Sequence, residues 1–132
     1  MISHVFVGVD AFEPAFNFYS AVLAELGLAL KFSDPHKPWA GWMSPHAARP
    51  LFVISKPFDG QAASNGNGQM VALLAPSRAA VDRAYARAID MGATCEGGPG
   101  LRPHYHADYY GAYFRDLDGN KIGICCHDAE TS

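Results

Sequence analysis

The residues best suited to chemistry by type and spacing are Arg102, His104 and His106, which lie close together in a stretch rich in glycine and proline. A guanidinium group beside two imidazoles can bind an anion, and an imidazole can also act as an acid or base near neutral pH. The same residues would also suit a surface loop or a contact with a second copy of the chain. The sequence leaves these alternatives open.

His4 and Cys125 lie in apolar, strand-like runs near opposite ends of the chain. An imidazole and a thiolate can ligate a metal, but a lone histidine in such a strand is more often a hydrogen-bonded structural residue. Cys125 and Cys126 are adjacent and should point to opposite faces of a strand, so we expect small buried side chains rather than a redox pair. Three cysteines in all do not suggest a secreted disulfide framework, which favours the cytoplasm.

Apolar periodicity predicts two similar halves that position these residues. In the first half, Asp10 and Glu13 have the spacing of a capping box, and an apolar stripe after them predicts a helix that ends at Gly27. Strand-like runs flank this helix at residues 2–9, 28–32, 39–44 and 50–56.

The second half repeats this order after a polar, glycine-rich link at residues 58–68. Ser77 is the expected N-cap of the second helix, and Gly92 its end. Further strands are predicted at 69–75, near Thr94, at 109–115 and at 121–127, with a long loop over 97–107.

Composition excludes two classes of partner. The net charge is −3, without the basic face that nucleic-acid binding needs. No apolar stretch approaches the roughly 18–20 residues of a membrane-spanning helix. Hydrophobic residues make up 49% of the chain, enough for a packed core. We therefore expect a globular protein with no nucleic-acid or membrane partner.

The segment Tyr109–Ile122, with its Asp-Leu-Asp-Gly-Asn turn, resembles the ending of the vicinal oxygen chelate superfamily, which includes glyoxalases, bleomycin resistance proteins and extradiol dioxygenases. The opening strand with His4, followed by Phe18 and Tyr19, resembles its first module. The resemblance implies one α+β domain over 1–132 and a homodimer. Two βαβββ modules, at about 1–57 and 69–128, would form a curved, cup-like mixed sheet with helices outside.

The resemblance also implies four positions where members of the superfamily hold a divalent metal. In this chain those positions are His4, Val53, Met70 and Gly123, of which only His4 offers a suitable donor. Cys125 would share the face of Gly123, but a site of His4 and Cys125 would lack the usual ligand count. We therefore expect no metal cofactor, with a divalent metal at His4 as the alternative.

The function predicted from these observations is binding of a small organic molecule in the cup. Tyr113 is implied by the resemblance to point inward, and Trp39 with Trp42 could form an aromatic wall or pack in the core. One alternative is a metal-dependent or acid–base lyase, isomerase or dioxygenase that uses His4; another is an interaction module with a filled cup. Candidate catalytic residues are His4, Tyr113, His104 and His106, and expected ligand contacts are His4, Trp42, Val53, Met70, Arg102, Tyr113, Gly123 and Cys125.

Overall fold

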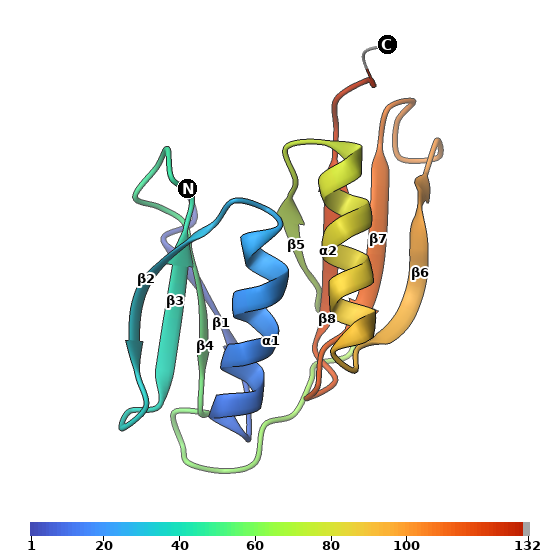
Figure 1. The fold of residues 1–132 in the computed structure, drawn as a ribbon. Helices are drawn as coiled ribbons and strands as arrows, with labels where there is room; N and C mark the ends of the chain where they lie inside the picture. The colour runs from blue at the N-terminus through green and yellow to red at the C-terminus, as the bar shows by residue number, and fades with distance from the viewer. Residues whose placement is uncertain (131–132) are drawn as a thin grey trace.

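A computed structural model describes residues 1–130, and its chain follows the order βαβββ twice (Figure 1). The first repeat contains β1 (His4–Gly8), α1 (Phe12–Ala24), β2 (Ala29–Asp34), β3 (Trp39–Met43) and β4 (Leu51–Ser55). The second contains β5 (Val71–Leu74), α2 (Arg78–Asp90), β6 (Thr94–Leu101), β7 (Tyr110–Arg115) and β8 (Lys121–Cys126).

Each repeat forms a four-stranded mixed sheet, in the orders β1-β4-β3-β2 and β5-β8-β7-β6. The first strand of each repeat runs parallel to the fourth, and the other pairs are antiparallel. α1 packs on the first sheet and α2 on the second, and the two helices also contact each other (Figure 1). The predicted α+β class with two βαβββ modules is confirmed.

The two modules do not share one continuous hydrogen-bonded sheet. Each sheet has its own two edge strands, β1 and β2 in the first and β5 and β6 in the second, and no strand pair crosses between the sheets among residues 1–130. The modules meet through α1, α2 and polar contacts of their loops instead. In the same part of the chain, neither helix has the length and apolar character needed to cross a bilayer.

Because side chains alternate along each strand, one face of each sheet packs against its helix and the other face points away from it. On β1, Val7 belongs to the buried core, as does Val9 just after the strand, whereas Phe6 points away from the core and is half exposed. The second module packs small residues under its helix, because Ala80, Ala84 and Ala88 all lie buried on α2. In each sheet, we call the face that points away from the helix the open face of that sheet.

The helix ends test three sequence predictions. The Ser77 hydroxyl accepts a hydrogen bond from the amide of Ala80 at 3.1 Å, which confirms it as the N-cap of α2. Gly27 and Gly92 follow the two helices with φ of +75° and +105°, a backbone conformation that favours glycine. These predictions are confirmed.

The predicted cap of the first helix is wrong. Ala11, not Asp10, is the N-cap of α1, and it makes no side-chain cap hydrogen bond. The Asp10 carboxylate accepts a hydrogen bond from the amide of Ala63 in the link at 2.6 Å, and the Asp10 amide donates to Asp118 Oδ1 at 2.9 Å. Long-range partners therefore take the groups that the local pattern assigned to the helix.

β6 is longer than predicted, because it includes residues 97–101 of the expected loop. Its ladder with β7 is irregular, with register shifts between Cys95 and Gly97 and between Gly97 and Gly100. Gly97 has a φ of +151°, at the limit of what other residues adopt, so glycine permits a bent strand where side-chain-bearing residues would favour a loop.

A buried carboxylate connects the two modules. Asp116, in the turn between β7 and β8, is 6% exposed. Its Oδ2 accepts hydrogen bonds from the Tyr19 hydroxyl of α1 at 2.5 Å and from Asn120 Nδ2 at 3.0 Å. Its Oδ1 accepts from the amides of Asp118 and Asn120, each at 2.9 Å. Asn120 Nδ2 also donates to the carbonyl of Gly8 at the end of β1 at 2.9 Å, so the turn is bonded to both a helix and a strand of the first module.

Substitutions at this contact test its contribution to stability. Asp116→Asn places an NH₂ group among donors and should lower the free energy of unfolding by about 2–4 kcal/mol. Tyr19→Phe removes only one donor and should cost about 1–2 kcal/mol. Urea unfolding of both single variants and the double variant measures this, and the double variant should lose less than the sum. An Asp116→Asn protein as stable as the parent would contradict this account.

Candidate functional site

The larger of the two cavities described here has a volume of about 530 Å³ and lies between the first sheet and the link. Aromatic side chains reach it from three elements: Phe6 of β1, Trp39 of β3 and Phe58 of the link. Phe58 is fully exposed and Phe6 is 54% exposed. A concave surface with accessible aromatic groups is the kind of site that binds small organic molecules. The other lining residues are Val7, Gly8, Ser55, Lys56, Pro57, Asp59, Ala62, Ala63 and Ser64.

A smaller cavity of about 150 Å³ adjoins the first and lies between the modules. Four lining residues belong to both cavities: Phe6, Val7, Gly8 and Ser64. The second module contributes Met70 and Lys121 to the small cavity. The remaining lining residues are Asn65, Gly66, Gln69, Val71, Asn120 and Ile122, so polar groups are prominent in this compartment.

The four positions where the sequence resemblance implies metal ligands do not present a ligand set. His4 is exposed near the start of β1, its Nδ1 lies 2.9 Å from the Ser3 hydroxyl, and it is not among the residues lining the two cavities. Val53 is buried and apolar. Met70 is 43% exposed and offers only a thioether, a poor ligand for hard divalent ions.

Gly123, the fourth position, has its side-chain space already filled. A Cβ added there would lie 3.2 Å from a ring carbon of Tyr113 and 3.3 Å from both the Met70 sulfur and Ala72 Cβ. Within residues 1–130, no group of three or more histidine, cysteine, aspartate or glutamate side chains could hold a metal ion. The residues present therefore do not fit the divalent metal that the resemblance implies.

The prediction that Trp42 contributes to an aromatic wall at the ligand site is wrong. Trp42 is 3% exposed and packs in the core on the helix side of β3, with its ring 5.9 Å from Phe16 and 6.4 Å from Tyr19 between centroids. Trp39, three residues earlier and on the other face of the strand, lines the larger cavity. Sequence reasoning also missed Phe6, although alternation places it on the His4 side of β1.

Arg102, His104 and His106 do not converge on one point. The Arg102 guanidinium donates to the carbonyl of Gly98 at 2.7 Å and lies 5.6 Å from the centre of the Tyr113 ring. The exposed His104 ring packs against that of Tyr105, at 4.3 Å between centroids. His106 contacts the chain beyond β8 instead, so the predicted anion or acid–base cluster is not assembled by these three side chains.

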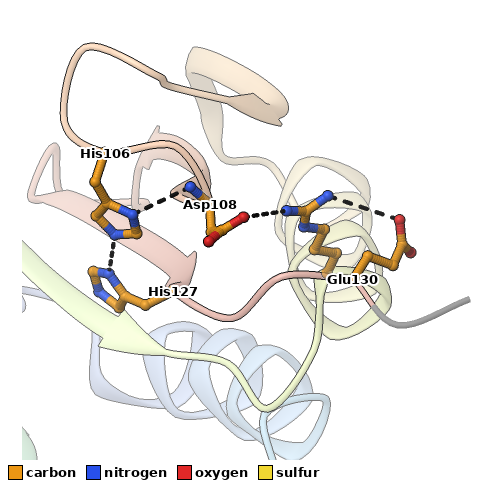
Figure 2. A network of polar contacts seen from close by, with 5 residues as sticks. His106, Asp108, His127 and Glu130 are labelled. Carbon is orange, nitrogen blue, oxygen red and sulfur yellow. Dashed lines mark hydrogen bonds and ion pairs between the residues drawn. The ribbon is translucent and has the colours of Figure 1, made fainter.

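His106 belongs to a row of polar contacts at the end of the second sheet (Figure 2). The amide of Asp108 donates to His106 Nδ1 at 3.2 Å, and His106 Nε2 lies 2.8 Å from Nδ1 of His127. The Asp108 carboxylate lies 4.0 Å from Arg78, which also lies 3.8 Å from Glu130 (Figure 2). Sequence reasoning missed His127, because only the fold brings the loop before β7 to the end of β8.

This row continues to Cys125 and two tyrosines on the open face. His127 Nε2 lies 3.6 Å from the sulfur of Cys125, and the hydroxyls of Tyr109 and Tyr113 are 2.8 Å apart. Burial raises the pKa of the Cys125 thiol. Burial and the hydrogen bond with Tyr113 raise the pKa of Tyr109 well above its usual range, so this phenol stays neutral.

Comparisons with known proteins agree with this architecture. The family model of the glyoxalase/bleomycin resistance protein/dioxygenase superfamily matches residues 1–124. The chain is similar to a glyoxalase/bleomycin resistance protein from Albidiferax ferrireducens, with 37% identity, a TM-score of 0.84, and coverage of 96% of this chain and 98% of that one. A search of curated proteins finds no match to the chain.

More distant similarities concern the fold alone. An antibiotic binding protein from a Streptomyces species, TnmS3, is 24% identical with a TM-score of 0.65, over 97% of this chain and 96% of that chain. A lactoylglutathione lyase from Agrobacterium tumefaciens is 19% identical with a TM-score of 0.63, over 96% of this chain and 92% of that chain. With the family model and the 37% identical structure both spanning nearly the whole length, the chain belongs to the glyoxalase/bleomycin resistance protein/dioxygenase superfamily.

Proposed function

We propose that this protein binds a small, largely aromatic or apolar organic molecule in the larger cavity, without a divalent metal held in the manner of the superfamily's enzymes. The observation that carries the proposal is the exposure of Phe6 and Phe58 in a cavity of about 530 Å³ that Trp39 also lines. The antibiotic-binding neighbour of the same fold supports a role in binding.

The exposed phenylalanines have no evident role in folding. Phe58 lies in the link, makes no part of the core cluster and leaves its whole ring in water. Covering apolar surface gains about 25 cal/mol per Å², so a planar apolar ligand on Phe6 and Phe58 gains affinity from rings that folding does not bury. These rings therefore favour an aromatic ligand over a polar one.

The donor set supports binding without the metal. A divalent ion held by side chains of β1, β4 and β8 and of the residue just before β5 needs nitrogen or oxygen donors, and three of these four positions hold valine, methionine and glycine. Tyr113 and Met70 fill the space above Gly123. We therefore propose that these positions shape an apolar surface rather than a coordination site.

Burial argues against covalent catalysis by the Cys125 thiol. Cys125 is buried, and this burial raises the pKa of its thiol, so the neutral thiol is favoured over the nucleophilic thiolate. The ring nitrogen Nε2 of His127 lies 3.6 Å from the Cys125 sulfur.

Replacing the exposed ring in the link tests the ligand site. Phe58→Ala should weaken binding of the neutral dye phenylnaphthylamine by about 5–10-fold, because the ring contributes contact area to an apolar ligand. The measurement is fluorescence titration to saturation. Leu30→Ala removes a half-exposed apolar side chain of β2, outside the residues that line the two cavities, and should leave the affinity unchanged.

A parallel thermal-shift series compares this dye with magnesium, manganese and zinc ions. The proposal requires a melting temperature that rises with dye concentration in the parent protein and rises less in Phe58→Ala. A large shift with a divalent metal that is lost in His4→Ala, together with no saturable dye binding, would refute it.

Alkylation by iodoacetamide tests the state of Cys125. In the native protein, the exposed Cys95 should react about tenfold or more faster than the buried Cys125, whose raised pKa keeps it protonated. Mass spectrometry of peptides after timed quenching measures the three rates, and unfolded protein supplies the control in which all cysteines react alike. Preferential labelling of native Cys125 would show an activated thiol and favour covalent catalysis.

A further inference from the structure

We infer that the ligand is an aromatic anion whose charged group is bound by Lys121 in the small cavity while its ring occupies the larger one. This inference rests on the proposed function and narrows its ligand class. Its structural basis is the continuity of the two compartments, which share Phe6, Val7, Gly8 and Ser64. A molecule in contact with Phe6 can therefore extend into either compartment.

The two compartments differ in chemistry. Three aromatic residues line the larger one, whereas the residues lining the small one include Lys121, Asn65, Gln69 and Ser64, which carry an ammonium, two amides and a hydroxyl. No aspartate or glutamate lines the small cavity. Amide and hydroxyl donors around one cation form a suitable site for a carboxylate, sulfonate or phosphate.

Among residues 1–130, Lys121 has no ion-pair partner. Within the part of the chain that the structure describes, no carboxylate lies within ion-pair distance of its ammonium group. Glu96 lies near enough to interact with it electrostatically, but Glu96 pairs with Arg115, whose Nε lies 2.8 Å from the carboxylate. The Lys121 ammonium lies 6.0 Å from the centre of the Tyr113 ring.

The charges around Tyr113 add to this positive field. Arg102 also lies beside the Tyr113 ring, at 5.6 Å, so two cations, Arg102 and Lys121, flank this ring, whereas the charge of Arg115 is paired with Glu96. In the larger cavity, by contrast, Lys56 and Asp59 both contribute, so its charges are balanced. An anionic group therefore gains most at the Lys121 end, which sets the orientation of the ligand.

Two dyes that differ by one sulfonate provide the test. Phenylnaphthylamine is neutral, and anilinonaphthalene sulfonate carries the same rings with a negative group. At low ionic strength the parent protein should bind the sulfonate dye about 5–10-fold more tightly than the neutral dye, as a charge-assisted contact predicts. Added salt should reduce this ratio, because it screens the partly exposed ammonium.

Three variants separate charge at Lys121 from charge elsewhere. Lys121→Gln should bring the ratio of the two affinities to about one, and Lys121→Arg should retain most of the preference for the sulfonate dye. Lys31→Gln makes the same charge change on the exposed surface of β2 and should leave the ratio as in the parent. Thermal melting confirms that each variant is folded.

The outcomes distinguish the inference from the proposed function. If neither dye binds saturably to the parent protein, the proposed function fails and the inference fails with it. If the neutral dye binds and the sulfonate dye binds no better, or if Lys121→Gln keeps the preference, the proposed function stands and the assignment of an anionic ligand to Lys121 is overturned.

Discussion

The arrangement of the two modules depends on the buried carboxylate of Asp116. No backbone ladder joins the sheets among residues 1–130, so the packing of α1 against α2 and a few directional contacts fix their relative position. Asp116 accepts hydrogen bonds from Tyr19 of the first module and from Asn120 in its own turn, and Asn120 in turn bonds Gly8. A charge removed from water needs all of these donors, and this requirement makes the contact geometrically specific.

The same contacts position the cavities. Gly8 lines both compartments and receives the amide of Asn120, while Ala63 of the link is bonded to Asp10, whose amide bonds the second module through Asp118. The wall formed by β1 and the cover formed by the link are therefore tied to one turn. The aromatic surface itself contributes little to this rigidity, because Phe6 and Phe58 lie outside the core.

The sequence predicts local structure better than it predicts the site. Both helices were foreseen, and α2 begins and ends 66 positions after α1, since 78 − 12 and 90 − 24 are both 66. Alternation separates Trp39 from Trp42 but does not say which of the two faces a helix. The hydrogen bonds of Asp10 and His127 join residues far apart in sequence, and no local pattern carries them. The helices could be predicted because they depend on the local spacing of residues. The faces of Trp39 and Trp42 and the partners of Asp10 and His127 could not, because they depend on strand register and packing.

The filled space above Gly123 limits how this scaffold can change its chemistry. A side chain introduced at this position by a single substitution would bring its Cβ to 3.2 Å from the Tyr113 ring and 3.3 Å from the Met70 sulfur, so these neighbours would have to shift. An oxygen donor at this position of β8 would therefore depend on rearrangement of Tyr113 and Met70 as well as on the substitution of Gly123 itself.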